Sequence, residues 1–498
     1  MKILNLGAGG FIGSHLTQRL LEEGHHVTAV DLYPDKINSI LQHPNLTFIR
    51  QDIRNAEWNL AHLVKDADLV IDLIAHANPG LYVRIPSEVT KETTDMPAFK
   101  VVLPMRPRAL RYATHVLLLL GCVGIGIRLY RDDDRYHRQD FKRYYVDAHL
   151  LAHGGDPWHG QLTTATSIQK IPYPPAFFFT FSPLCRFPPR TAHWIWESLQ
   201  ISFLVAALII TLHEIGATAS GNFVRSVFAF AFLFPPLQNA IHWGQPTALL
   251  LLLLVASWSC ARGGRDLTAG LLLAGAILLK MFPVVVGGYF LFCHRWKVLA
   301  SGILFTLGIS AFLLAFYGFQ RNLEFVRDAR ISAYWLDQSG NLSIIGNFHW
   351  LLGQTGTASR AGAILFAALA SLASISLVVC SGITTPRVAD ASPQVSGLCW
   401  SFWVLLAILL SPVAWDHYLV LLIPMYIFLV WQWLSTPLRD NPAEFLGILL
   451  IGTGLLGFFI LPYYAPARHL HGYLVLVLAS YAGLFLVLGN GGRFDTCS

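Results

Sequence analysis

A succession of long apolar runs, beginning near residue 110 and continuing to residue 488, most constrains the fold of this chain. A transmembrane helix needs about 20 predominantly apolar residues. The chain is 54% hydrophobic and only 13% charged, against about 25% charged in soluble domains. We expect a polytopic α-helical membrane protein with about 11–13 transmembrane or re-entrant helices, because several runs are shorter than a span. The runs lie near residues 110–129, 173–187, 193–213, 223–238, 245–260, 266–279, 281–293, 297–317, 341–354, 361–383, 395–413, 417–434, 443–461 and 470–488.

The distribution of charge divides the chain into parts. Residues 1–95 contain no long apolar run and hold 8 Lys/Arg against 12 Asp/Glu, whereas the remainder holds 27 against 17. The basic excess suits loops that face anionic lipid, and its scatter between apolar runs argues against nucleic-acid binding. We expect a small α/β domain over 1–95, a basic linker over 96–109, a membrane domain over 110–490 and a tail over 491–498.

Basic residues also predict the topology in the cytoplasmic membrane. The basic segment 106–111 precedes the first apolar run and places that end, with the N-terminal domain, in the cytoplasm. The polar loop 130–171 is then external. Later basic residues mark inner loops, namely Arg262, Arg265, Arg295, Lys297, Arg387 and Arg439.

Several polar residues fall on the same outer side in this topology. They include Gln245, Lys280 and the run Trp415-Asp-His417. The arrangement requires one short element between 172 and 260 not to cross the membrane, and 341–354 to be re-entrant. Phe234-Pro-Pro236 and Tyr173-Pro-Pro175 are candidate helix breakers, because proline cannot donate to the helical ladder.

The first 95 residues carry the pattern of a dinucleotide-binding fold. Gly7, Gly10 and Gly13 follow an apolar strand and open a helix, an arrangement that lets the backbone approach a pyrophosphate. Asp31 ends the second strand, where it would bond a ribose hydroxyl, and Asp52-Ile53 would flank an adenine. The expected strands are 2–6, 26–30, 47–50 and 68–74, with a helix over 15–23.

Residues 1–93 resemble the extended short-chain dehydrogenase/epimerase family. The run Gly10-Phe-Ile-Gly-Ser-His-Leu16 and the segment Arg84-Ile-Pro86 are most similar to its UDP-glucuronate decarboxylases. That resemblance implies chemistry by a Tyr-x-x-x-Lys pair and a substrate domain, and residues 1–95 contain no such pair. Two interpretations stay open: a vestigial unit that has lost its cofactor, or one that binds NAD(P) without catalysis.

The loop before the second apolar run is the first charged stretch of the membrane domain. Its segment 139–158 holds three aspartates, and Asp140 is our candidate for a catalytic base. Asp147 lies two helical turns further on and is the second choice. Asp156 sits in a Gly-Gly-Asp-Pro turn, where a capping role is expected. Tyr144 and Tyr145, between the first two aspartates, are candidates for stacking on a sugar.

Ionisable residues within or between apolar runs are costly and indicate a functional site. Lys280 precedes Met-Phe-Pro283, and Asp416-His417 interrupt two apolar runs. Lysine and histidine suit a phosphate that becomes a leaving group, and Gln245 is expected to support them. Each residue alone has an ordinary explanation, such as a lysine that snorkels from a helix end. Because these residues are expected on the same side of the membrane as Asp140, we favour one shared site. A single base is sufficient there for an inverting displacement.

The sequence predicts neither a metal site nor a disulfide. All seven cysteines lie in the membrane part, mostly inside apolar runs, and none forms a C-x-x-C pair. The acidic run Asp132-Asp-Asp134 is flanked by Arg131 and Arg135, so we interpret it as a charge-paired surface.

The membrane domain contains a set of motifs in a fixed order, namely Asp140-Phe-x-x-Tyr-Tyr, Leu150-Leu-Ala-His-Gly-Gly-Asp-Pro-Trp158, Tyr173-Pro-Pro-Ala-Phe-Phe, Gly244-Gln245, Leu279-Lys-Met-Phe-Pro283 and Leu410-Ser-Pro-Val-Ala-Trp-Asp-His417. Together they resemble glycosyltransferase family 87. The resemblance covers roughly 105–490 and implies a GT-C fold, with a sugar donor carried on polyprenyl phosphate. It also implies an inverting, metal-independent transfer outside the membrane, with mannose as the expected sugar and a lipid or glycan as acceptor. The family's loop aspartate falls on Asp140, its lysine on Lys280, and its Trp-Asp-His run on Trp415-Asp416-His417.

Two other functions remain as alternatives. A lipid-linked sugar transporter would require repeat symmetry and charges at the bilayer midplane, neither of which the sequence displays. A membrane-anchored, NAD-dependent epimerase or decarboxylase would depend on residues 1–95 for all activity. A polyprenyl-phosphate glycosyltransferase needs no nucleotide cofactor for transfer.

Overall fold

The computed structural model consists of two compact units, which we describe separately. The first contains Met1–Ala113 and Trp433–Pro437, and the second contains Thr114–Gln432 and Leu438–Ser498. The structure describes residues 1–52, 63, 66–73, 107–133, 140–155, 173–217, 221–328, 341–346, 392–435, 446, 449–455, 478–480 and 482.

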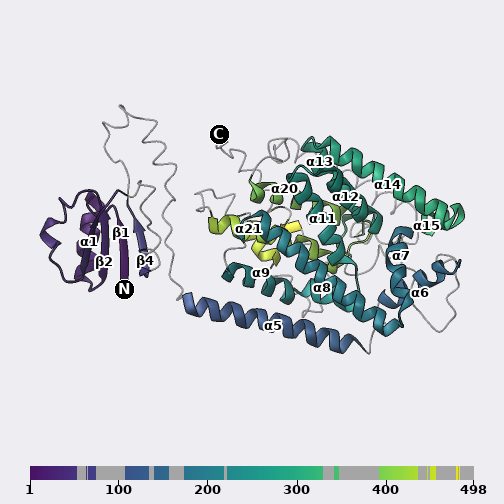
Figure 1. Cartoon of the computed structure of the whole chain (residues 1–498), viewed down its shortest axis with the longest axis horizontal. Coiled ribbons are helices and arrows are strands. Elements are labelled where there is room, and N and C mark those ends of the chain that lie inside the picture. Colours follow the sequence, from purple (N-terminus) through teal and green to yellow (C-terminus); the bar gives the residue numbers. More distant parts are fainter. Residues whose placement is uncertain are drawn as a thin grey trace. The chain divides into compact units, whose positions relative to one another are not determined.

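The N-terminal unit contains a parallel four-stranded sheet in the order β3-β2-β1-β4 (Figure 1). The predicted strands and helix are present with shifted ends. Helix α1 begins at Phe11, four residues earlier than predicted, because Gly10 already occupies the N-cap position. The elements are β1 (Lys2–Leu6), α1 (Phe11–Glu22), β2 (His26–Asp31), β3 (Leu46–Arg50) and β4 (Leu69–Asp72).

Helices make up nearly all of the described membrane unit, as the sequence predicts. Four helices are long and apolar enough to cross a membrane, or five if one bent pair counts as a single span, among the described residues. The four are Arg111–Arg131 within α5 (Pro107–Asp133), α8 (Pro189–Glu214), α14 (Trp296–Tyr317) and α20 (Pro393–Leu410). The predicted runs 361–383, 443–461 and 470–488 lie largely outside the described residues.

Proline positions explain two of the interruptions. The bent pair is α9 (Gly221–Leu233) and α10 (Pro235–Trp243), which meet at 52° across Phe234. The expected breaker Tyr173-Pro-Pro175 acts differently, because Pro175 begins the short helix α7 (Pro175–Phe181). Proline is well suited to a first helical position, where its missing N–H has no partner to lose. The apolar run 173–187 is therefore α7 followed by the 3₁₀ helix η3 (Ser182–Arg186), and not a long span.

Helices α11 (Thr247–Arg262) and α12 (Asp266–Leu279) pack against each other as a hairpin. The first starts directly after Gln245 and the second ends directly before Lys280, so these two residues lie at the same end of the pair. The arginine-rich connection between the helices lies at the other end. The remaining elements are α6 (Asp140–Ala152), η5 (Phe282–Val286), α13 (Gly287–Phe292), α15 (Phe319–Asp328), η7 (Asp416–Leu422) and α21 (Ile423–Ser435).

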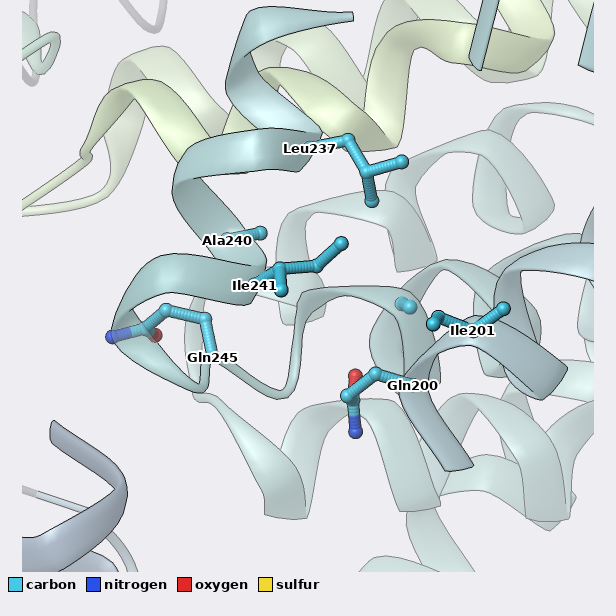
Figure 2. Close-up of a pocket in the computed structure, with 7 residues that line it drawn as sticks. Gln200, Ile201, Leu237, Ala240, Ile241 and Gln245 are labelled. Atoms are coloured by element: carbon cyan, nitrogen blue, oxygen red, sulfur yellow. The ribbon is translucent and has the colours of Figure 1, made fainter. Parts of the chain in front are cut away.

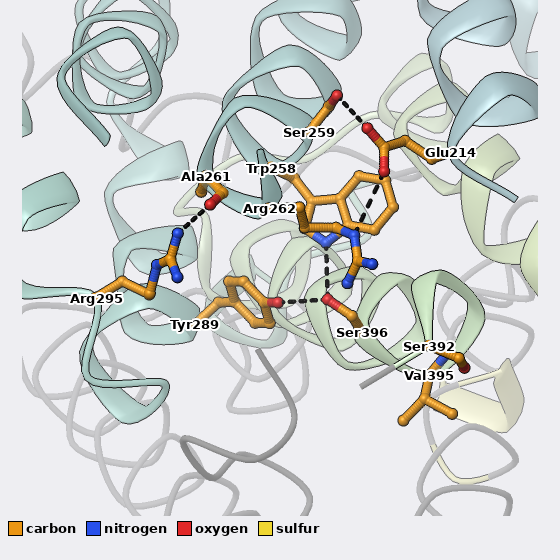
Figure 3. A network of polar contacts seen from close by, with 10 residues as sticks. All are labelled: Glu214, Trp258, Ser259, Ala261, Arg262, Tyr289, Arg295, Ser392, Val395 and Ser396. Carbon is orange, nitrogen blue, oxygen red and sulfur yellow. Dashed lines mark hydrogen bonds and ion pairs between the residues drawn. The ribbon is translucent and has the colours of Figure 1, made fainter. Parts of the chain in front are cut away.

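A polar network ties the opposite ends of these helices together (Figure 3). Glu214 accepts a hydrogen bond of 2.5 Å from Ser259 Oγ, and its other carboxylate oxygen lies 3.4 Å from Arg262 Nε. Nearby, Ser396 Oγ accepts from Trp258 Nε1 at 3.2 Å and lies 2.8 Å from the Tyr289 hydroxyl. These contacts join α8, α11, α13 and α20.

Candidate active site

Asp140 is the first residue of α6, where the helix dipole favours a negative charge. One of its carboxylate oxygens, Oδ2, accepts a 2.5 Å hydrogen bond from Gln245 Nε2. Burial raises the pKa of the Asp140 carboxyl from 3.8 to about 6, although the Lys280 ammonium and the hydrogen bond from Gln245 both oppose that rise. A carboxyl group with such a pKa exchanges its proton near neutral pH.

The Gln245 amide joins this acid to a cation. Its Oε1 accepts from the Tyr173 hydroxyl at 3.1 Å and from Lys280 Nζ at 3.3 Å. Both acceptor sites of the oxygen are thereby used, which leaves the amide nitrogen to face Asp140. Gln245 is 5% exposed, so water cannot easily replace these partners.

Lys280 lies in the break between α12 and η5, where its backbone is extended. Its ammonium donates to the Tyr418 hydroxyl at 3.0 Å and lies 4.2 Å from the centre of that ring. The Tyr173 ring is 5.2 Å away on another side. A cation between two aromatic rings is stabilised by their quadrupoles, which helps to offset the cost of burying the charge.

Asp416 and His417 stand at the start of η7, just before Tyr418. Asn239 of α10 donates to Asp416 Oδ1 at 2.6 Å, and His417 Nδ1 lies 3.9 Å from the same oxygen. His417 is 4% exposed. The next residue, Tyr418, contacts Lys280, so Asp416 and His417 lie beside the cluster. Asn239 holds the Asp416 carboxylate in place.

The two tyrosines of α6 lie in different surroundings. The Tyr144 hydroxyl is 3.0 Å from that of Tyr173, so Tyr144 belongs to the buried cluster. Tyr145 instead donates to the Phe187 carbonyl oxygen at 2.8 Å, outside the cluster. Asp147, the second candidate base, is buried in an ion pair 2.5 Å from Arg143 Nε. Asp156, the third aspartate of this loop, lies outside the described residues.

Three polar residues of the cluster are absent from the sequence prediction. Tyr173 begins one of the motifs and Tyr418 directly follows another, but neither is assigned to the site, because the chain holds 17 tyrosines and most are expected at membrane interfaces. Asn239 has no signal of its own in the sequence. All three are identified by their contacts with the predicted site residues in the fold, and not by their residue type.

A small cavity borders the cluster beside Gln245 (Figure 2). Its volume is about 10 Å³, far below the roughly 300–1,000 Å³ of typical ligand pockets. It does not by itself define a substrate site. The lining is mostly apolar and comes from Gln200, Ile201, Leu237, Ala240, Ile241, Gln245 and Ala248.

In the N-terminal unit the glycine turn has the geometry that a nucleotide phosphate requires. Gly7 has a φ of 79°, and a Cβ on Gly13 would lie 2.0 Å from the Gly7 carbonyl oxygen. Asp31 Oδ2 accepts a 2.8 Å hydrogen bond from the Gly9 N–H, at the end of β2 where a ribose would bind. Gly7, Gly10, Gly13 and Asp31 would hold the cofactor. Asp52 lies just after β3, and Ile53 is outside the described residues.

The apolar helices indicate a multi-pass membrane protein. Residues 172–412 match the family model Glycosyltransferase family 87, and residues 3–99 match the NAD dependent epimerase/dehydratase family. The chain therefore joins a region of the family 87 glycosyltransferase type to an N-terminal region of the epimerase/dehydratase type. The family 87 match is shorter than the resemblance predicted from the motifs, since Asp140 precedes it and Asp416 follows it. No solved structure matches the chain significantly.

Proposed function

We propose that this glycosyltransferase moves a hexose, with mannose as the expected sugar, from a polyprenyl-phosphate donor to a hydroxyl acceptor. The observation that carries the proposal is the side chain of Gln245, which links the Asp140 carboxylate to the Lys280 ammonium. One amide thus joins a base and a cation that are 140 residues apart in the chain. This is the pairing that transfer from a phosphate leaving group requires.

The reaction is a single displacement at the anomeric carbon of the donor sugar. Asp140 accepts the proton of the acceptor hydroxyl as its oxygen forms the new glycosidic bond. The bond between the sugar and the phosphate oxygen breaks, and the electron pair leaves with the polyprenyl phosphate. Lys280 and His417, supported by Asp416, stabilise the charge that gathers on this phosphate. One attack on the face opposite the leaving group inverts the anomeric configuration.

The proposed reaction takes place on the outer side of the cytoplasmic membrane. The arginines between α11 and α12 supply the argument, because positive loops remain in the cytoplasm. Gln245 and Lys280 lie at the other end of this hairpin. A reporter fused within the 130–171 loop tests this orientation, and a cytoplasmic signal there would contradict it.

Substitution of Asp140 by Asn tests the role of the base. The amide has nearly the same shape but cannot accept the acceptor proton, so we expect transfer of labelled sugar from polyprenyl phosphate to fall by about 10²–10⁴-fold. Membrane insertion and binding of the lipid donor should persist.

Asp266→Asn provides the matched control, because Asp266 is also the first residue of a helix. It lies at the opposite end of α12 from Lys280 and is paired with Arg295 at 3.1 Å. We expect its transfer rate to stay close to that of the wild type. Equal activity of the Asp140→Asn variant and the wild type would refute the assignment.

A further inference from the structure

Helix α15 presents an apolar stripe on its exposed side. Phe319 is 67% exposed and Val326 is 62% exposed. Leu323 lies between them and is half buried. The spacing of four and three residues places all three on one face of the helix.

The opposite face of α15 is polar and turned toward the protein. Glu324 is 3% exposed and accepts a 2.7 Å hydrogen bond from Gln320 Nε2. Arg321 is half buried and donates to the Tyr317 carbonyl oxygen at 3.1 Å. A helix in water would place its charges outside and its apolar residues inside. In α15 the charged residues Glu324 and Arg321 face inward beside Phe325, which packs against the core, whereas Phe319 and Val326 are exposed.

The stripe continues an apolar surface of α14, which is long and apolar enough to span a membrane. Phe312 and Phe316 of that helix are 51% and 60% exposed. Phe179 of α7 packs against both of them, with ring centres 5.6 Å apart in each pair. In Figure 1, α15 follows α14 at the end of the helical unit that also carries α6 and α7. The exposed surface of a span and the stripe of α15 therefore form one continuous surface.

We propose that α15 is an interfacial helix that docks on a phospholipid bilayer, with Phe319, Leu323 and Val326 inserted beside the end of α14. Amphipathic helices of this kind lie in the interface plane with their apolar face toward the acyl chains. The inward-facing charges and the continuity with α14 favour lipid over a protein partner as the occupant.

Docking of α15 on the bilayer would also position Asp140. This part of the inference rests on the proposed function, in which Asp140 is the base. Arg321 Nη2 donates a hydrogen bond to the carbonyl oxygen of Gly154, in the turn that follows α6. Gly154 has a φ of 83°, which glycine adopts without strain. Because Asp140 begins the same helix, docking of α15 would set the depth of the carboxylate relative to the headgroup region. A phosphate attached to a membrane-embedded lipid chain lies at that depth.

Photocrosslinking of the full chain in phospholipid nanodiscs tests the lipid contact. A benzoylphenylalanine replaces Phe319 in one variant, Phe312 in a second and Tyr33 in a third. Tyr33 is the matched control, an aromatic residue that is 60% exposed in the N-terminal unit. We expect crosslinks to phospholipid from positions 319 and 312 and only background from position 33. Background labelling at 319, or a crosslink from 319 to a second protein chain, would overturn the proposal.

The Arg321→Met variant tests the link to the catalytic helix. We expect transfer in nanodiscs to fall about tenfold, as for loss of a hydrogen bond from a charged donor, while the crosslink from position 319 persists. An unchanged transfer rate would refute the coupling to α6. The crosslinking result does not depend on turnover, so it also separates this inference from the proposed function. An Asp140→Asn variant that stays active, with lipid crosslinks intact, would reject only the assignment of the base.

Discussion

Gln245 connects the two charged residues on which the proposed chemistry depends. Its oxygen accepts from Tyr173 and Lys280, so its nitrogen is committed to the Asp140 carboxylate. Leucine at this position would fill similar space and remove all three contacts. The hydrogen bond from the Gln245 amide to Asp140 can therefore be tested by measuring how its removal changes the pKa of Asp140.

The rate of transfer should depend on the ionisation of Asp140. Its pKa is raised to about 6 by burial, and only the deprotonated form can act as a base. We expect kcat/KM to fall tenfold for each pH unit below this pKa. It should fall again at higher pH, because burial lowers the pKa of the Lys280 ammonium to about 7 and the neutral amine cannot stabilise the phosphate. The measurement is a profile of kcat/KM against pH that extends about two units either side of the Asp140 pKa.

In the Gln245→Leu variant the same profile should shift to higher pH. The hydrogen bond from Gln245 lowers the pKa of Asp140, so its removal raises that pKa and leaves less base at a given pH. The lower rate of this variant should recover as the pH is raised. A reduced rate with an unshifted profile would indicate a structural role for Gln245 that is independent of Asp140.

The sequence indicated the charged residues of the site more readily than their neutral neighbours. Asp140, Lys280 and Asp416 attract notice because ionised groups are expensive near apolar segments. Tyr173 and Tyr418 could not be selected in this way, since tyrosine is ordinary at the ends of membrane helices. The structure brings the residues together through hydrogen bonds whose partners are up to 177 residues apart, and no local pattern encodes such pairings.

At the scale of the element, the turn between α10 and α11 determines where Gln245 points. Gly244 has a φ of 67°, and a Cβ there would lie 2.8 Å from Cβ of Phe141, the residue after the base. The Gly244 carbonyl oxygen accepts a 2.7 Å hydrogen bond from Trp196 Nε1 on α8. The turn thus packs between α6 and α8, and glycine is the residue that fits both the close approach and the left-handed conformation.

Trp196→Phe should weaken this turn without emptying the core. The phenyl ring keeps most of the apolar contact, whereas the N–H donor to Gly244 is lost. A net hydrogen bond contributes about 0.5–1.5 kcal/mol, so we expect a fall in kcat of up to about tenfold with little change in donor binding. The measurement is the transfer rate at saturating donor.

Trp194→Phe is the matched control on the same helix, because Trp194 is 38% exposed whereas Trp196 is 3% exposed. Its transfer rate should stay within about twofold of the wild type, as for most surface substitutions. Equal losses in the two variants would mean that the bond to Gly244 has no special effect. A fall in protein yield for Trp196→Phe alone would point to folding, and a thermal unfolding measurement separates that case.

The helices and their breaks can be predicted because apolar periodicity and proline are signals in the local sequence. The break at Phe234 and the short helix α7 follow from prolines. The orientation of α15 has no comparable local signal, since an amphipathic sequence does not reveal which face meets the protein. Only the packing of Glu324 and Arg321 decides that orientation.

At the scale of the whole molecule, the chain combines two units of different ancestry. The order β3-β2-β1-β4 supplies the half of a dinucleotide fold that carries the glycine turn. The family match for this unit ends at residue 99, and the Tyr-x-x-x-Lys pair expected for dehydrogenase chemistry is missing from residues 1–95. The chemistry proposed for this chain therefore depends on the membrane unit alone.

Removal of residues 1–95 should leave sugar transfer largely intact, because every residue of the proposed site follows position 139. The basic linker 96–109 is retained in the truncated chain to preserve topology. The measurement is transfer per inserted molecule in isolated membranes. Complete loss of transfer, with normal insertion, would favour an NAD-dependent enzyme whose activity resides in the N-terminal unit.

A substitution within the full chain makes the same test without truncation. A Cβ on Gly13 would lie 2.0 Å from the Gly7 carbonyl oxygen, so Gly13→Val should distort the phosphate-binding turn. We expect any NAD(H) binding, measured by calorimetry, to be lost while transfer persists. Gly24→Ala is the companion control: it strains a backbone with a φ of 80°, but a Cβ there meets nothing within 4 Å and the position is at the far end of α1 from the turn. If Gly13→Val abolishes transfer and Gly24→Ala does not, the nucleotide turn controls the membrane enzyme, and the two units act as one.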